Sequence, residues 1–388
     1  MRLTQRKMLP VVHALLSVFT INNVAHAEDL PAQRSSSMNG LCEVTDLEFD
    51  VGSHSLNAHG AVASTNTCAK LKPAWGIEDG TPEAKMDSLL CDQVFEIGYF
   101  LKFQAHQPPG MFLRDVVIPL FTALSRNASS EAADDQGVVL PAIERVDSGV
   151  IDWDTNFFLE SSRIKNQLIQ AIARGCNVLP LDKRLSAVNK TLCFRKAYFG
   201  VPELVDQEAA NALLAFVERV KETLAVHTPR PDPKHQPRIG LALPLLHFRT
   251  TNHVLPDYRR TIAKKISSFA KAVEIDYSRL SLKEQVMQTQ DLDVVLVAGS
   301  DMISLSSALY LPPWGVVVRF NKETSGKKKE DPFEHLLESR GVLLTTTASM
   351  EAGRSLNDVP VFGDNTISDI EHILRKAVAI VQHNLQKL

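Results

Sequence analysis

The sequence lacks a strong excess of charge of either sign. Its 388 residues include 42 lysines and arginines against 45 aspartates and glutamates, which gives a formal net charge of −3. A chain without a basic excess shows no overall electrostatic footprint for nucleic acid or for anionic membranes. Hydrophobic residues make up 44% and charged residues 22% of the chain, as is ordinary for a globular protein with sizeable cores.

Cysteine is scarce, and no two cysteines have the C-x-x-C spacing of a structural zinc site. In an oxidising compartment we expect one or two disulfides, with at least one thiol left over because the number of cysteines is odd. The pairs we favour are Cys42 with Cys68 and Cys176 with Cys193, although spacing alone does not fix the connectivity. The fifth cysteine is Cys91.

Long apolar runs are absent except near the amino terminus. Basic residues precede the mostly apolar residues 8–21, and Ala25-His-Ala27 fits a secretory cleavage pattern. The alternative is a type II membrane anchor, but the run is shorter than the roughly twenty residues that a span needs. We expect residues 1–27 to be a signal peptide and the chain to be secreted or lumenal, in the endoplasmic reticulum or Golgi. Glycosylation sequons at Asn127 and Asn189 fit that address.

A proline-rich stretch divides the chain into two halves with alternating strand and helix patterns, which predicts an α/β protein. We expect a loosely structured lead over residues 28–90, with one or two edge strands. A first α/β domain over 91–229, a linker over 230–237 and a second α/β domain over 238–388 follow. In the first domain, apolar spacing predicts strands at 94–103, 138–140, 177–180 and 191–200, and helices at 111–124, 160–173 and 207–224.

The second domain contains the most informative stretch, residues 280–320. Ser281 and Glu284 have the capping-box spacing that begins a helix, and Asp293-Val-Val-Leu-Val297 predicts a strand covered on both faces. Ala298-Gly-Ser-Asp301 ends that strand, and a second helix and a second strand follow. Such a unit presents free backbone N–H groups at the carboxyl edge of the strand, where anionic groups bind.

The remainder of the second domain continues the alternation. Its predicted strands are 238–249, 273–276 and 341–347, and its predicted helices are 258–272, 333–339 and a terminal helix that begins with a Ser368–Glu371 capping box and ends at 385.

Several of these stretches resemble glycosyltransferase family 61, which includes EGF-domain O-GlcNAc transferases and plant xylosyltransferases of the secretory pathway. The resemblance covers residues 90–385. It implies a GT-B-like fold of two Rossmann-like domains that face a cleft, with the donor bound by the second domain. The matching residues are Glu284-Gln285, the apolar strand 293–297, the segment 305–314 that ends in Leu-Pro-Pro-Trp, the Cys-Phe…Gly pattern within 191–200, and Pro109, Gly110, Asp115 and Pro119.

Met111 and Asp301 stand where the family has histidines. A methionine cannot accept a proton. An aspartate repels a diphosphate unless a cation intervenes, although an aspartate before Met302 also suits the N-cap of a helix.

The resemblance implies an inverting glycosyltransferase that moves a sugar from a nucleotide-sugar donor, UDP-linked, to a hydroxyl of a secretory protein or glycan. Asp115 is the predicted general base. Arg249 is the predicted phosphate ligand, because a guanidinium is always charged and binds phosphate bidentately; an exposed arginine at a strand end is the alternative. The other predicted donor-site residues are Glu284, Gly299, Asp301, Ser304, Ser306 and Ser307.

No tightly bound cofactor and no metal are expected, because neither Asp152-Trp-Asp154 nor Asp291-Leu-Asp293 is placed where a divalent ion would hold a diphosphate. The replaced histidines also favour a rival function, a catalytically silent relative that binds a nucleotide, a glycan or a partner protein. A third possibility is that only the fold is shared and that the chain binds another lumenal ligand.

Overall fold

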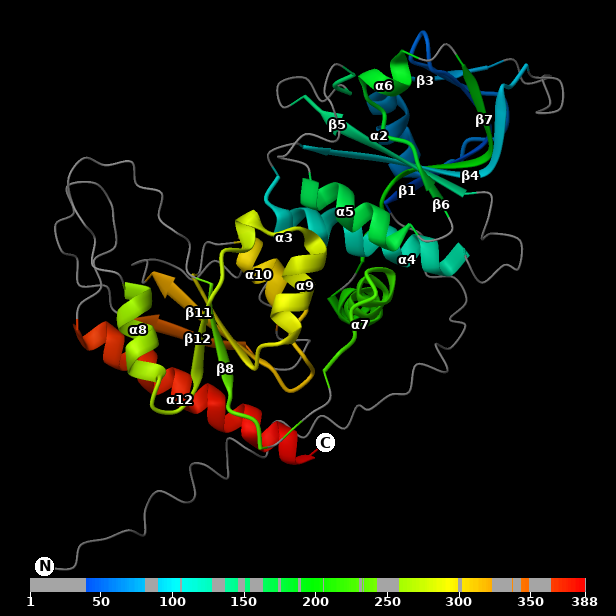
Figure 1. The fold of residues 1–388 in the computed structure, drawn as a ribbon. Coiled ribbons are helices and arrows are strands. Elements are labelled where there is room, and N and C mark those ends of the chain that lie inside the picture. The colour runs from blue at the N-terminus through cyan, green and yellow to red at the C-terminus, as the bar shows by residue number, and fades with distance from the viewer. Residues whose placement is uncertain are drawn as a thin grey trace, which may run out of the picture. The chain divides into compact units, whose positions relative to one another are not determined.

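A computed structural model describes most of Asn39–Leu388, which forms one compact unit. The described residues are 40–80, 90–104, 107–127, 137–145, 151–153, 163–173, 176–187, 190–204, 206–229, 232, 234–242, 258–298, 302–322, 337, 343–348 and 364–387. The predicted signal peptide, Arg249, Gly299 and Asp301 lie outside these ranges. Within them the protein is a mixed α/β structure with two sheets, as the alternating pattern predicts (Figure 1).

The first sheet has seven strands in the order β3-β2-β1-β7-β4-β5-β6. Strand β1 runs antiparallel to both of its neighbours, and every other neighbouring pair is parallel. The strands are β1 (Leu41–Asp50), β2 (Ser55–Ala58), β3 (Ile77–Asp79), β4 (Gln93–Gln104), β5 (Gly137–Glu144), β6 (Cys176–Val178) and β7 (Thr191–Gly200).

An aromatic core fills one face of this sheet, where Trp75 of α2 (Asn66–Trp75) packs against the strands. The ring of Phe100 stacks on that of Phe199 with centroids 4.5 Å apart, and Trp75 meets Phe199 edge-on at 5.3 Å. The other helices of this half are α3 (Pro109–Phe112), the π-helical turn η2 (Leu113–Val117), α4 (Ile118–Asn127), α5 (Arg163–Ile172), α6 (Lys183–Ser186) and α7 (Asp206–Thr223).

The expectation of a loosely structured lead is wrong for residues 41–79, which form three strands and a helix. Strand β1 lies inside the sheet rather than at its edge, because it pairs with both β2 and β7. Cys42 and Val44, two residues apart in β1, are completely buried. The high serine and asparagine content of the region masked this alternation.

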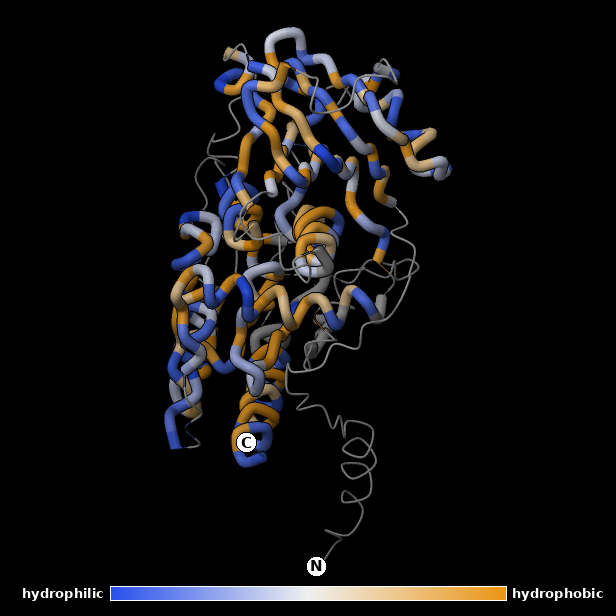
Figure 2. The backbone as a smooth tube through the Cα atoms, turned by 90° about the vertical axis from the view of Figure 1, so that its right-hand side faces the viewer, coloured by the Kyte–Doolittle hydropathy of each residue, from blue (hydrophilic) through white to orange (hydrophobic). Residues whose placement is uncertain are grey.

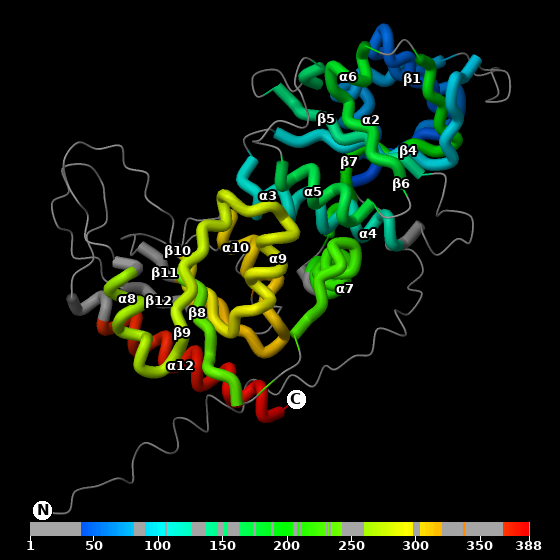
Figure 3. Tube along the Cα trace, viewed as in Figure 1, coloured from blue at the N-terminus to red at the C-terminus, as the bar shows by residue number. Residues whose placement is uncertain are grey.

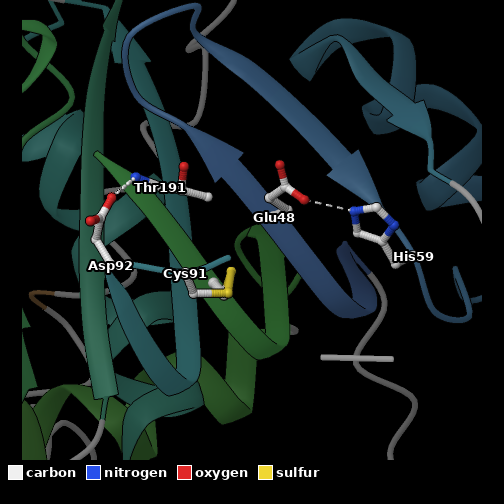
Figure 4. The surroundings of a disulfide bond; sticks show 6 residues. Glu48, His59, Cys91, Asp92 and Thr191 are labelled. Carbon is white, nitrogen blue, oxygen red and sulfur yellow. Dashed lines mark hydrogen bonds and ion pairs between the residues drawn. A yellow bond between two sulfur atoms is a disulfide. The ribbon is translucent and has the colours of Figure 1, made fainter. Parts of the chain in front are cut away.

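Two disulfides cross-link the first sheet. The predicted Cys42–Cys68 pair is confirmed, but the predicted Cys176–Cys193 pair is wrong, because Cys193 bonds Cys91 and Cys176 remains a thiol. Strands β4 and β5 lie between β6 and β7, which separates Cys176 from Cys193 by roughly 14 Å, too far for a disulfide. Next to the bonded pair, Asp92 accepts a 2.7 Å hydrogen bond from the Thr191 N–H (Figure 4).

The second sheet is entirely parallel, with five strands in the order β12-β11-β10-β8-β9. Its strands are β8 (Arg238–Ala242), β9 (Lys271–Glu274), β10 (Val294–Ala298), β11 (Val316–Lys322) and β12 (Leu343–Ala348). The chain enters the sheet at β8, moves outward to the edge strand β9, and then crosses back over β8 to form β10, β11 and β12 in turn. This is the strand order of a doubly wound sheet. Figure 3 traces this path.

Helices cover both faces of the second sheet (Figure 1). Helices α8 (Tyr258–Ile266) and α12 (Asp364–Lys387) pack on the face that presents Ile239, Val294 and Val316. The other face carries α9 (Leu282–Gln290), which follows the short 3-10 helix η4 (Tyr277–Arg279), and α10 (Met302–Ala308), which contacts β10. The buried, β-branched strand sequence is what double coverage requires.

Two predicted helix boundaries are wrong. Helix α8 ends at Ile266. There the hydroxyls of Ser267 and Ser268 donate hydrogen bonds to the backbone carbonyls of Lys264 and Lys265 in the last turn. Helix α12 begins at Asp364, so Ser368 lies within it rather than at its N-cap. The buried residues of α12 lie along one side of the helix, and this side packs against the second sheet. Figure 2 shows hydrophobic and hydrophilic residues alternating along the helix.

Candidate functional site

The candidate site is the carboxyl edge of the second sheet between β8 and β10. Ala242, the last residue of β8, pairs with Val297 of β10, so the two strands end side by side. From β8 the chain moves outward to β9 and then returns to form β10 on the other side of β8. In doubly wound sheets, ligands bind outside the carboxyl ends of the strands at this kind of switch point.

Glu284 acts as a capping residue at the start of α9. Its Oε2 accepts hydrogen bonds of 2.7 Å from both the N–H and the hydroxyl of Ser281, while the Ser281 hydroxyl accepts from the Glu284 N–H at 3.3 Å. The Ser281 hydroxyl and N–H lower the pKa of this exposed carboxyl. The predicted capping box is confirmed, whereas donor contact by Glu284 stays a prediction.

The predicted serines of α10 differ in accessibility. Ser307 is fully buried, and its hydroxyl lies 3.0 Å from Gln285 Oε1 and 2.9 Å from the Ile303 carbonyl. Ser304 is also buried, whereas the partly exposed Ser306 donates to the Ile303 carbonyl at 2.8 Å. A ligand at the edge would therefore reach Ser306 more readily than the other two.

Gln285 organises the polar contacts beneath these serines. Its amide nitrogen donates to the Tyr277 carbonyl at 2.9 Å, and its Oε1 accepts from Ser307. The Tyr277 hydroxyl is 2.8 Å from Thr289 Oγ1, and all four side chains are buried. Gln285 thus joins η4, α9 and α10, a role that sequence reasoning missed although the Glu284-Gln285 pair had been singled out.

Arg319 is a second residue that sequence reasoning missed. It is buried, with 6% of its surface exposed, and it pairs in register with Val297 near the end of β10. The available signal was an arginine inside the otherwise apolar run Val316-Val-Val-Arg-Phe320.

Asp115, the predicted base, lies in η2 and is partly exposed. Arg114 binds both of its oxygens, through Nε to Oδ1 and through Nη2 to Oδ2 at 2.9 Å. Gln107 donates to the same Oδ2 at 3.3 Å. These three hydrogen bonds use most of the carboxylate's acceptor sites, so a substrate hydroxyl would have to reach the remaining one.

Two helices of the first half contact the helices that carry the predicted donor residues. Helix α3, which leads directly into η2, packs against α10. The Leu282 N–H at the start of α9 also donates to Gln167 Oε1 of α5 at 2.9 Å. Met111 is exposed on α3. The structure therefore brings α3, the helix that precedes η2, next to the serine-bearing helix α10.

Lys165 of α5 lies buried at the carboxyl end of β4. Its Nζ donates to the Gln104 carbonyl at 3.1 Å and lies 5.6 Å and 5.5 Å from the ring centroids of Phe103 and Phe112. Burial lowers the pKa of this lysine to about 8. Sequence reasoning missed Lys165 because it occupies one turn of an ordinary amphipathic helix.

The carboxylates of the two Asp-x-Asp sequences have protein partners where the structure describes them. Asp291 lies 3.5 Å from Arg238 and Asp152 lies 3.2 Å from Arg145, while Asp293 is buried and accepts N–H groups. Among the described residues, no group of three or more histidine, cysteine or acidic residues could hold a metal ion. In the part of the chain that the structure describes, no helix is both long enough and apolar enough to cross a membrane.

Comparisons with known proteins give little further information. No protein-family model and no curated protein matches the chain. Among solved structures it is similar to the metal-soaked Flv1 flavodiiron core from Synechocystis sp. PCC6803, with 9% identity and a TM-score of 0.23. The match covers 61% of this chain and 54% of that one, so the chain spans about half the length of that structure. Similarity this low carries no argument about fold or function.

Proposed function

We propose that this chain is an inverting glycosyltransferase with a GT-B-like arrangement of two Rossmann-like domains. It takes a UDP-linked sugar at the carboxyl edge of β8 and β10 and transfers it to a hydroxyl of a secretory protein or glycan. The observation that carries the proposal is the strand order of the second sheet, which leaves the ends of β8 and β10 side by side at a switch point. The resemblance to glycosyltransferase family 61 supplies the reaction.

The chemistry needs stabilisation of a departing diphosphate. In the proposal, backbone N–H groups after β10 and the guanidinium of Arg249, which follows β8 in the sequence, take this negative charge. Asp115 removes the proton of the acceptor hydroxyl as its oxygen bonds to the anomeric carbon and the bond to the diphosphate breaks. Two disulfides in the first sheet are compatible with the secreted or lumenal address that such an acceptor requires.

A thermal-shift screen against nucleotides and nucleotide-sugars, with and without divalent cations, tests donor binding. A ligand that binds only the native state raises the melting temperature by mass action. We expect a shift with a UDP-sugar that is lost in Arg249→Ala and kept in Arg260→Ala, which removes an exposed arginine from α8. Absence of a shift with every nucleotide would contradict the proposal.

A second function, nucleotide or glycan binding without transfer, is favoured by one specific observation. Asp115 is held by Arg114 and Gln107, and the neighbouring histidine position is Met111. Incubation of the chain with the bound donor and an acceptor library separates the two functions. Product that disappears in Asp115→Asn supports transfer, whereas binding without product supports the silent relative.

A further inference from the structure

Asp293 is the centre of a buried cluster at the amino edge of the second sheet, opposite the candidate site. It immediately precedes β10, and only 4% of its side chain is exposed. Its Oδ2 accepts from His235 Nε2 at 2.7 Å and from the Arg238 N–H at 2.8 Å. Its Oδ1 accepts from the indole N–H of Trp314 at 3.0 Å. The carboxylate thus joins the segment before β8 to the starts of β10 and β11.

The environment of His235 requires both of its ring nitrogens to be donors. Nδ1 is hydrogen-bonded to the backbone carbonyl of Asp232, and Nε2 to the carboxylate of Asp293. Neither oxygen can donate, and a neutral imidazole carries only one N–H. The contacts are therefore those of an imidazolium.

We propose that His235 is a pH-sensitive latch, which holds the proline-rich segment before β8 on the amino edge of the second sheet while its ring is protonated and releases it when the ring becomes neutral. This segment is the covalent connection between α7 and β8. The latch therefore sets how firmly residues 234–238 are fixed at the start of the second sheet. It is independent of the proposed transferase activity.

The direction of the pH dependence follows from the groups that act on the ring. Burial lowers the pKa of His235, but the Asp232 carbonyl, the hydrogen bond and charge of Asp293, and the charge of Asp232 together raise it above the usual value. The side chain of Arg238 pairs with Asp291. Because the folded pKa is raised, the latch is fully formed below the ordinary histidine range and is lost as the pH rises through the folded pKa.

Trypsin provides a local probe of the latch. Lys234 is exposed and precedes His235, whereas the neighbouring Arg230 is followed by proline, which blocks cleavage. The cleavage rate after Lys234 is divided at each pH by that of a synthetic peptide with the sequence of residues 226–242, which removes the enzyme's own pH dependence. Loss of a charge-assisted hydrogen bond changes the opening equilibrium by on the order of tenfold or more. We expect the normalised rate to rise by about that factor between pH 6 and pH 8.5.

Two variants and one spectroscopic measurement complete the test. His235→Gln should be cleaved at every pH at the normalised rate that the wild type reaches at pH 8.5. His227→Gln, which alters an exposed histidine nearby, should behave as the wild type. An NMR titration of the His235 ring in the wild-type chain should give a pKa above the usual histidine value. A normalised cleavage rate independent of pH in the wild type, or a His235 pKa at or below the usual histidine value, would overturn the proposal.

Discussion

The part of the chain built on the first sheet contains all five cysteines and an aromatic core, whereas the part built on the second contains no cysteine and a core mainly of valine, leucine and isoleucine. Disulfides tie β1 to α2 and the start of β4 to β7. In the second sheet, buried hydrogen bonds centred on Gln285 and Asp293 join the helices and strand ends instead. The difference teaches that the first sheet is cross-linked covalently, while the second is joined by buried polar contacts.

The two regions also contain ionisable groups whose pKa values are shifted in opposite directions. Lys165 beside the first sheet has a pKa lowered by burial, whereas His235 beside the second has a pKa raised by its oxygen partners. Raising the pH therefore removes the penalty for burying the charged Lys165 near the first sheet, and it removes the stabilising contact of the charged His235 from the second.

The largest expected effect comes from breaking the covalent link in the first sheet. Cys91 and Cys193 are 102 residues apart, and closing a loop of that length stabilises the folded state by roughly 4 to 5 kcal/mol. The double variant Cys91→Ala/Cys193→Ala should lose about this much unfolding free energy in urea. Hydrogen exchange should show that the opening concentrates in β4 and β7. Cys176→Ala is the matched control, and an equal loss there would contradict the assignment.

The next largest effect is a rise in stability with pH that originates at Lys165, beside the first sheet. Lys165 is charged in the unfolded chain up to a pKa near 10.5 but loses its proton near 8 in the folded state. Between these values the unfolded state binds more protons, so stability should rise with pH, by on the order of 3 kcal/mol over the whole range. Denaturant unfolding from pH 7 to pH 10 measures this rise. It should be absent in Lys165→Met and present in Lys183→Met, which removes an exposed lysine.

A smaller effect tests the polar contacts of the second sheet. Ser307→Ala leaves Gln285 Oε1 without its hydroxyl donor in a buried position. An unsatisfied buried acceptor costs about 1 to 3 kcal/mol. The partly exposed Ser306→Ala is the control and should lose less unfolding free energy. If the two variants are equally stable, Ser307 is not the structural contact described above.

The smallest effect is expected at the start of α9. Ser281→Ala removes the capping hydroxyl from a confirmed capping box, which typically costs about 1 kcal/mol. Thermal unfolding should show this loss, with Ser267→Ala at the exposed end of α8 as the comparison. A wild-type melting temperature for Ser281→Ala would mean that another group caps the helix.

Local patterns in the sequence predicted most strands and helices of both regions, because apolar periodicity and capping boxes are local signals. The strands predicted at 94–103 and 191–200 correspond to β4 and β7, and the capping box at Ser281 is confirmed. Cysteine pairing failed because it depends on strand order, which brings Cys91 rather than Cys176 next to Cys193. Strand order is set by packing over long sequence separations, which periodicity does not contain.

The site was predicted less completely than the fold. The patterns identified the carboxyl edge of β10 and the residues of α9 and α10. They could not show that Ser307 is buried or that Arg114 binds Asp115. Residues such as Gln285, Arg319 and Lys165 acquire their roles from tertiary burial, so their sequence context gave only weak signals.

Hydrogen exchange measured with and without a saturating UDP-sugar tests the central claim most directly, because ligand contact slows exchange in the segments that it orders. The account predicts protection in peptides that span the end of β8 and residues 243–257, and the end of β10 and residues 299–302, with little change in β1 to β3. Protection confined to the first sheet, or no protection by any UDP-sugar, would contradict a donor site at the carboxyl edge of β8 and β10.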